Sequence, residues 1–173
     1  MVRLELLSPE DREQFIKDNQ EAFKYGACGE VGEIDDDFNG DEEIISRETI
    51  TRCIDHGIAY RIVEDGIKVG GLIQRIDESS NKNELEILFI NPKYHNKGLG
   101  QMAWKEVERL YPKTKIWITC TPYFEKRNIH FYVNKLGFKI VKFYNSHYPD
   151  PNEDEKSEEG PSEMFLFEKT ANQ

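Results

Sequence analysis

The chain has 173 residues, a length that suits one domain with its own hydrophobic core rather than two. Hydrophobic residues make up 38% and aromatic residues 12%, which is more apolar content than disordered chains usually carry. The formal net charge is -10, from 33 acidic and 23 basic side chains. This balance argues against a protein that coats nucleic acid or an anionic membrane through its net charge.

The sequence shows neither a recognisable targeting segment nor a cysteine pattern that would cross-link the chain. No stretch reaches the roughly 20 apolar residues that a membrane helix needs, and the first residues lack the pattern of a signal peptide. We therefore expect a cytoplasmic protein with no membrane partner. The three cysteines, Cys28, Cys53 and Cys120, are odd in number and widely spaced, so they indicate neither a disulfide framework nor a zinc site.

The first third of the chain is predicted to form a strand and two helices. Alternating residues at 2–7 predict the strand, and Ser-Pro-Glu-Asp at 8–11 is typical of a helix start, with the helix running to about Tyr25. Residues 26–43 contain eight acids, four glycines and no Lys or Arg, which predicts a loop or a broken helix. Helical spacing resumes at 44–56.

A run of strands follows. Two segments of period-two alternation flank Asp65 and Gly66, which predicts a β-hairpin because Asp-Gly is a favoured hairpin turn. A third strand is predicted at 84–92. By alternation this strand places Glu84, Glu86, Leu88 and Ile90 on one face, and Leu85, Ile87 and Phe89 on the other.

The remainder of the chain alternates between helices and strands. Helices are predicted at 98–111 and 124–136, and strands at 115–121, 138–144 and 163–169. Residues 145–162 include three prolines and an acidic run, so we expect a long exposed loop before the last strand. The order of elements predicts one parallel pair of strands in an otherwise antiparallel sheet, within a single α+β (mixed α/β) domain over 1–173.

The stretch that indicates a chemistry leads from the strand at 84–92 into the next helix. Gly98 and Gly100 allow the backbone to come close to a ligand, and the free N–H groups of a helix start favour phosphate. Lys97 adds a positive charge there. The missing third glycine and the absence of Gly-Lys-Ser or Gly-Lys-Thr argue against Rossmann and P-loop sites, so nucleotide binding is disfavoured.

This stretch, ELEILFINPKYHNKGLGQ, resembles the GNAT superfamily of acetyl-CoA-dependent N-acetyltransferases. The signature of that family is an apolar strand, a Pro, and then Gln/Arg-x-x-Gly-x-Gly/Ala at the start of a helix. The downstream NIHFYVNKLGFKIV resembles the later helix and strand of the same family. The resemblance covers nearly all of the chain. It implies a central mixed, mostly antiparallel sheet of about seven strands flanked by about four helices, with acetyl-CoA as cosubstrate and no metal.

The resemblance also implies which residues hold coenzyme A. Main-chain N–H groups of the glycine loop would bind the pyrophosphate, through His95, Asn96, Lys97, Gly98, Leu99, Gly100 and Gln101. The strand before the loop would pair with the pantetheine arm through Leu88, Phe89 and Ile90, and N–H groups near the first two could hold the developing oxyanion. Asn128 would hydrogen-bond the same arm. His95 stands where the family has Gln or Arg, a departure that mainly backbone contacts should tolerate.

The reaction needs a base and an acid. An alkylamine with a pKa of about 10 is protonated at neutral pH, so a base must take its proton before it attacks a thioester. Glu84 or Glu86 could do so through water, since both share a face of their strand. The departing thiolate needs a proton, and the resemblance implies Tyr132 as the acid. Tyr132 lies five residues before Gly137, where the family usually has four.

The sequence leaves the acceptor and the alternatives open. The acceptor is expected to be a primary amine of a small molecule or peptide. The acids at 30–43 would favour a cationic one, although a solvated acidic loop explains them better. The unusual His95 and the spacing of Tyr132 suggest an alternative, a sensor module that binds coenzyme A without catalysis. A homodimer is compatible with the resemblance, since this family often dimerises. Residues 89–145 carry eleven Lys and Arg against three acids, so an anionic cofactor would be drawn there.

Overall fold

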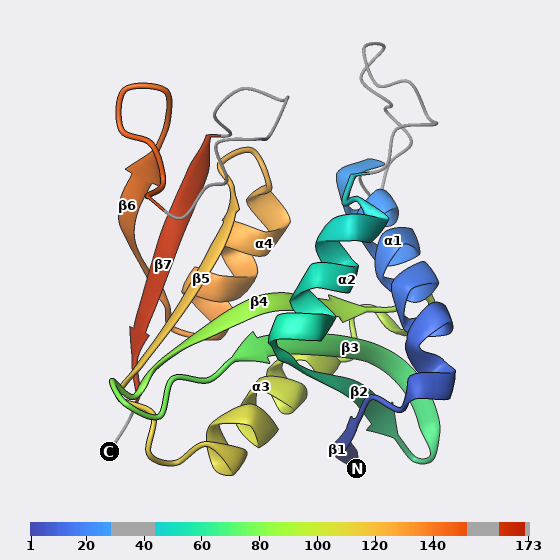
Figure 1. Cartoon of the computed structure of the whole chain (residues 1–173). Helices are drawn as coiled ribbons and strands as arrows, with labels where there is room; N and C mark the ends of the chain where they lie inside the picture. Colours follow the sequence, from blue (N-terminus) through green and yellow to red (C-terminus); the bar gives the residue numbers. More distant parts are fainter. Residues whose placement is uncertain (29–43, 152–162, 172–173) are drawn as a thin grey trace.

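The computed structural model describes residues 1–28, 44–151 and 163–171 (Figure 1). A seven-stranded sheet runs through the molecule in the order β1-β2-β3-β4-β5-β7-β6. The strands are β1 (Val2–Leu6), β2 (Ile58–Glu64), β3 (Ile67–Arg75), β4 (Lys82–Ile90), β5 (Ile116–Pro122), β6 (Lys139–Tyr144) and β7 (Met164–Thr170). Among these seven described strands, β4 and β5 pair in parallel and all other neighbours are antiparallel. The mixed, mostly antiparallel sheet expected from the sequence is confirmed.

Four α-helices of the described residues flank the sheet: α1 (Arg12–Cys28), α2 (Arg47–His56), α3 (Leu99–Leu110) and α4 (Lys126–His130). Helices α1 and α2 cover one face of β2–β4, and α3 covers the opposite face (Figure 1). The apolar stripe of α3, at helical spacing, is buried against the sheet: Leu99, Ala103, Trp104 and Val107. A second core under α1 and α2 contains Phe15, Ile16, Ile50 and Ile73. Within the described residues, no helix has the length and apolarity that crossing a membrane requires.

The predicted helix at 124–136 differs from a regular α-helix. It begins as α4 and continues as a π-helical turn over Phe131–Lys135, in which the N–H of Leu136 donates to the carbonyl of Phe131 at 3.0 Å. A π turn holds one residue more than an α turn, and such insertions are rare. The acidic stretch at 30–43 and most of the predicted loop at 145–162 lie outside the described residues.

Strand β4 contains a bulge at Glu86. Leu85 pairs with Gln74 of β3, and Ile87 pairs with the adjacent Ile73, so Glu86 has no partner residue in β3. A bulge adds one residue to one strand and shifts the alternation of its side chains between the two faces of the sheet.

The predicted division of the β4 side chains between two faces is therefore wrong. Leu85 lies in the core beneath α3, and Leu88 and Ile90 pack against the same core. Ile87 and Phe89 lie in the opposite core, beneath α1 and α2. Simple alternation put Leu85 with Ile87 because the sequence carries no local signal for the bulge.

A buried ionic cluster fixes α1 to the sheet. Arg61 of β2 has a side chain only 3% exposed, and its guanidinium donates to Asp11 at 2.6 Å and to Asp18 at 2.7 Å. It also lies over the ring of Phe15, 5.1 Å from the centroid. Burial alone would raise the pKa of Asp11, but its bonds to Arg61 and Lys68 lower it. The cluster fixes the start of α1 to β2, the strand next to one edge of the sheet.

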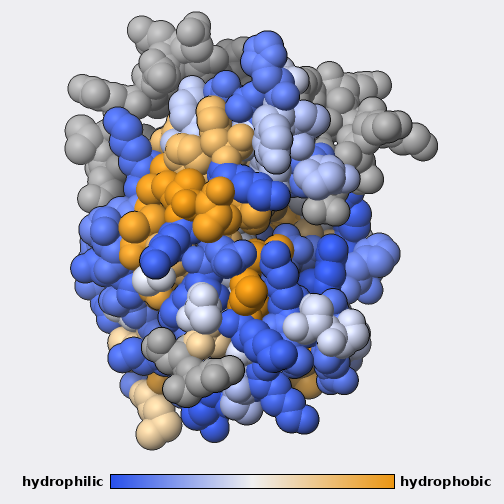
Figure 2. All heavy atoms as spheres, turned by 90° about the vertical axis from the view of Figure 1, so that its left-hand side faces the viewer, coloured by the Kyte–Doolittle hydropathy of each residue, from blue (hydrophilic) through white to orange (hydrophobic). Residues whose placement is uncertain are grey.

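Strand β6 forms one edge of the sheet. Figure 2 faces this side of the molecule and shows an apolar area within a largely hydrophilic surface. Three apolar side chains of β6 are 41% to 46% exposed: Ile140, Val141 and Phe143. An edge strand with exposed apolar side chains is a surface on which another chain can pair.

Candidate active site

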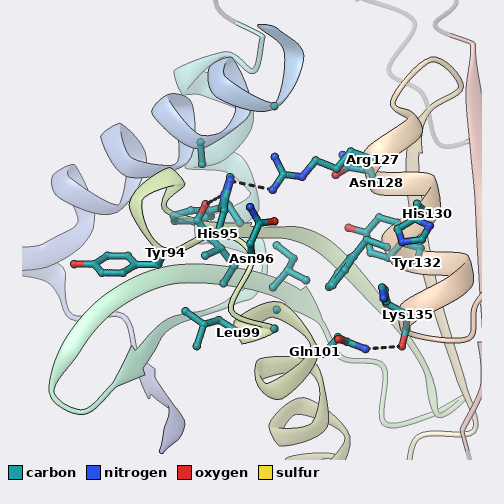
Figure 3. A pocket seen from close by; sticks show the side chains of 18 of the residues that line it. Tyr94, His95, Asn96, Leu99, Gln101, Arg127, Asn128, His130, Tyr132 and Lys135 are labelled. Atoms are coloured by element: carbon teal, nitrogen blue, oxygen red, sulfur yellow. Dashed lines mark hydrogen bonds between the residues drawn. The ribbon is translucent and has the colours of Figure 1, made fainter. Parts of the chain in front are cut away.

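The parallel strands β4 and β5 separate soon after they pair. Their pairing is confined to residues 82–84 of β4 and 116–118 of β5. Beyond that point a cavity of about 550 Å³ is lined by the second half of β4, the β4–α3 loop, α4 with its π-helical turn, and the end of α1 (Figure 3). The cavity thus follows the edge of β4 that β5 leaves free.

The β4–α3 loop brings all seven predicted loop residues, 95–101, to the cavity wall. Asn96 has φ 63° and Gly98 has φ 70°, so two left-handed residues turn the chain sharply into α3. Successive N–H groups in such turns form concavities that bind anions. Gly98 is the N-cap of α3, and it has no side chain that could accept a hydrogen bond from the helix. It therefore leaves the first N–H groups of α3 available to a ligand.

Gly100 is required for space. A Cβ at this position would lie 2.9 Å from the ring of Phe131, which belongs to the π-helical turn. The two walls of the cavity therefore touch at Gly100. Gln101 adds a second link, because its side-chain amide donates to the carbonyl of Lys135 at 3.2 Å.

The backbone of β4 is exposed to the cavity at alternate residues. The N–H of Asn91 donates to Val69 of β3 at 2.8 Å, so the backbone groups of Leu88 and Ile90 point to the opposite edge. Among the described strands, none pairs with that edge, because β5 pairs only with residues 82–84 of β4. Phe89 also lines the cavity, but its backbone groups face β3. Leu88, through both of its backbone groups, and Ile90, through its N–H, can therefore hydrogen-bond an extended ligand, whereas the carbonyl of Ile90 accepts from Nε2 of His95.

Tyr132 lines the cavity from the π-helical turn and is 7% exposed. Its ring packs against Phe138 and Phe167. Burial raises the pKa of Tyr132 to about 12, against the opposing effect of a hydrogen bond with Thr119. The phenol is therefore protonated at neutral pH and able to donate. The additional residue of the π turn accommodates the five-residue spacing to Gly137, so the unusual spacing does not turn Tyr132 away from the cavity.

Asn128 also lines the cavity, one turn before Tyr132. Its side-chain amide donates to the hydroxyl of Thr121 at 3.4 Å, a long bond that fixes the amide loosely. The predicted cofactor residues of the loop, β4 and α4 are thus brought together around one cavity, with Tyr132 among them.

Glu84 and Glu86 lie elsewhere, on the α2 side of the sheet, and do not line this cavity. Glu86 accepts a hydrogen bond from Arg75 at 2.5 Å, and its other, buried carboxylate oxygen has no hydrogen-bond partner in the part of the chain that the structure describes. Burial raises the pKa of Glu86 despite the lowering effect of Arg75. For Glu84, burial and then the negative charges of Glu86 and Asp150 raise the pKa. The structure brings the two carboxylates to each other but not to Tyr132.

Glu125 and Arg127 are among the cavity-wall residues that the sequence did not indicate. The carboxyl of Glu125 lies in the wall, and burial raises its pKa. Arg127 crosses toward the loop and donates to Nδ1 of His95 at 2.9 Å. Basic residues are unfavourable at the start of a helix, so Lys126 and Arg127 at the beginning of α4 are a signal that could have indicated a ligand-binding role.

Comparison with known proteins agrees with this geometry. Residues 17–138 match the model of the acetyltransferase (GNAT) family. The uncharacterised protein YrkN of Bacillus subtilis (strain 168) is 40% identical over 175 residues, which cover 97% of this chain and 92% of YrkN. The family match covers well over half of the chain, and the relative is similar over almost its whole length.

Two solved structures share the fold at low sequence identity. A ribosomal-protein-alanine N-acetyltransferase from Escherichia coli has a TM-score of 0.67 at 14% identity, covering 100% of this chain and 96% of that one. The PaiA N-acetyltransferase from Thermoplasma acidophilum, in complex with coenzyme A, has a TM-score of 0.64 at 21% identity, covering 98% and 99%. With the family match and the similarity to YrkN, these findings show that the chain belongs to the GNAT family and is an acyltransferase of the N-acetyltransferase type.

Proposed function

We propose that this protein transfers the acetyl group of acetyl-CoA to a primary amine of a small molecule or peptide by direct attack. The neutral phenol of Tyr132, buried in a cavity that the glycine loop also lines, is the observation that carries the proposal. The amine nitrogen attacks the thioester carbon, the C–S bond of the tetrahedral intermediate breaks, and Tyr132 gives its proton to the departing thiolate.

The donor is held mainly by main-chain groups. N–H groups over 96–101, with the left-handed turns at Asn96 and Gly98, support binding of the diphosphate. Lys97 and Lys135 in the cavity wall add positive charge. The free edge of β4 supports pairing with the pantetheine arm, and the N–H of Leu88 is the donor for the oxyanion.

The base for the amine is Glu84 or Glu86, acting through water. Their raised pKa values support this role, because a carboxylate that binds protons more readily is a better base. Neither reaches the described cavity directly. The acceptor would therefore enter from the α2 side of β4 and meet the thioester at the bulge.

A cationic acceptor, such as a polyamine or a Lys side chain, fits the charges at that side. The negative charges of Glu86 and Asp150 act on Glu84 there, and one buried oxygen of Glu86 has no hydrogen-bond partner among the described residues. Release of free thiol from acetyl-CoA, measured across a panel of amines, tests both activity and preference. Turnover on cationic amines alone supports the proposal, and turnover only on neutral amines contradicts the acceptor class.

The alternative of a coenzyme A sensor without catalysis rested partly on the spacing of Tyr132. The π-helical turn accounts for that spacing, which removes one reason for the alternative. Binding of coenzyme A with no thiol release on any amine would favour the sensor. Gly98→Trp tests the site itself. Gly98 has a φ of 70°, which strains any other residue, and it lies in the cavity wall, so the bulky side chain should weaken binding of coenzyme A.

The assembly and location are also proposals. The apolar edge strand β6 supports a homodimer, in which Val141 would be buried between two copies. Val141→Lys should lower the mass measured by light scattering from dimer to monomer, and a wild-type monomer would contradict the homodimer. A single domain over 1–173 and a cytoplasmic location stay predictions from the sequence.

A further inference from the structure

His95 and Arg127 face each other across the cavity (Figure 3). His95 belongs to the β4–α3 loop and Arg127 to α4, 32 positions apart in the chain. The guanidinium Nη2 of Arg127 donates to Nδ1 of His95 at 2.9 Å. His95 is also the position at which the loop departs from the Gln or Arg of the family signature.

The partners of His95 fix the proton on its ring. Nε2 lies 2.7 Å from the carbonyl oxygen of Ile90, which can only accept, so Nε2 carries the hydrogen. Arg127 can only donate, so Nδ1 is the acceptor. His95 is thus neutral in this arrangement. Its ring also packs edge-on against Tyr25 of α1, with 5.3 Å between centroids, so it is held from several sides.

A neutral partner leaves the charge of Arg127 uncompensated. Arg61, Arg75 and other arginines bond to carboxylates, whereas the hydrogen-bond partner of Arg127 is an imidazole. Glu125 is only two residues away, yet its pKa is raised by burial alone, without a lowering effect of Arg127. In the part of the chain that the structure describes, the remaining donors of this exposed guanidinium have no protein acceptor.

Arg127 also lies where an anion is expected. It forms part of the same cavity wall as the left-handed turns at Asn96 and Gly98 and the free N–H groups of the α3 start. Arginine presents a planar fork of donors that suits phosphate oxygens. A fixed, uncompensated guanidinium beside an anion-binding turn has the chemistry of a phosphate ligand.

We propose that Arg127 binds the diphosphate of coenzyme A and that His95, as a neutral positioning residue, holds Arg127 in place for it. This inference rests on the proposed use of acetyl-CoA as donor. The imidazole accepts one hydrogen bond from Nη2 and leaves the other N–H donors of the guanidinium for the phosphate oxygens.

The test measures dissociation constants by calorimetry for coenzyme A, 3′-dephospho-coenzyme A and S-acetylpantetheine, which has no phosphate. Arg127→Ala should weaken binding of the first two by about 10-fold or more, as expected for loss of a charged hydrogen bond, and leave S-acetylpantetheine unchanged. Lys126→Ala is the matched control, since Lys126 is an exposed neighbouring cation outside the cavity wall. It should leave all three constants unchanged.

His95 is tested by rescue and by a double variant. His95→Gln should keep most of the affinity, because an amide can donate to Ile90 and accept from Arg127, whereas His95→Ala should not. In the Arg127→Ala background, His95→Ala should have no further effect. An additive loss would contradict the positioning role.

Other outcomes overturn the inference in distinct ways. Unchanged binding of coenzyme A by Arg127→Ala, or an equal loss for S-acetylpantetheine, rules out a phosphate contact. A loss for coenzyme A but not for the dephospho form moves the contact to the 3′-phosphate and contradicts the diphosphate assignment. If the wild-type protein binds no coenzyme A, the proposed function fails instead.

Discussion

The two ends of the space between β4 and β5 are built in different ways. At the loop end, main-chain N–H groups and the cations Lys97, Arg127 and Lys135 surround the cavity. At the α2 end, Glu84 and Glu86 lie at a bulge, with raised pKa values. Arg75 pairs with Glu86, so Glu84 supplies the negative charge that would draw a cationic acceptor to the α2 end, away from the cations at the loop end. In the proposed function, the loop end would hold the donor mainly through backbone shape, and the α2 end would depend on particular side chains.

Helix α1 contributes to both ends. Ala22, Phe23 and Gly26 line the cavity at the loop end, and Phe15 and Ile16 share a core with Ile50 of α2, on the side of the other end. If the two ends are independent, a change in how α1 docks should alter one end more than the other. The predictions below use this contrast.

The largest effect is expected from Arg61→Ala. It leaves Asp11 and Asp18 without their buried partner, and breaking such a cluster typically costs about 3–5 kcal/mol of unfolding free energy. Urea denaturation measures the loss. Arg3→Ala, which removes an exposed pair with Glu5, should leave the free energy nearly unchanged. Unaltered stability of Arg61→Ala would show that the cluster does not fix α1.

The same variant sharpens the comparison between the ends. At temperatures where Arg61→Ala stays folded, its loosened α1 should raise the KM for the amine more than the dissociation constant of coenzyme A. The proposed donor site depends mainly on main-chain groups of the β4–α3 loop, which α1 does not contain. Equal increases would contradict the independence of the two ends.

Tyr132→Phe removes the proposed acid at the point where the two ends meet. We expect kcat to fall by about 100-fold, at the lower limit for loss of a general acid, with unchanged affinity for coenzyme A. Steady-state kinetics and calorimetry measure the two quantities. Tyr148→Phe, at an exposed tyrosine, is the matched control. A variant with normal kcat would exclude Tyr132 from proton transfer.

A smaller change in rate is expected from the double replacement of Glu84 and Glu86 by Gln. A base with a raised pKa gives a rate that increases with pH through that pKa, so the acidic limb of kcat/KM should disappear in the variant. At pH 7 we expect a loss of about 10-fold, because the free amine in solution can still react. An unchanged profile would mean that these carboxylates are not the base.

The same contrast explains what could be predicted from the sequence. The sequence could indicate the loop at 95–101, which lies in the cavity wall, because its signal is glycines at fixed local spacing, and local spacing is what a sequence displays. The faces of β4 were predicted wrongly because the bulge at Glu86 depends on pairing with β3. The bond between His95 and Arg127 joins segments that meet only in the fold. Side-chain partnerships of this kind have no signature along the chain.

The smallest expected effect is on stability at the acceptor end. Folding raises the pKa of Glu84, so the folded protein holds the proton of this carboxyl more tightly than the unfolded protein does. Ionisation of Glu84 as the pH rises therefore lowers the free energy of unfolding. Glu84→Gln should therefore unfold at a slightly higher temperature than wild type at pH 7, and the difference should vanish at pH 3, where Glu84 is protonated in both states. Glu13→Gln is a control of opposite sign, since the bond from Arg47 lowers the pKa of Glu13 and its charge favours folding at pH 7. A Glu84→Gln variant that is less stable at pH 7 would show that this carboxylate serves the fold rather than the reaction.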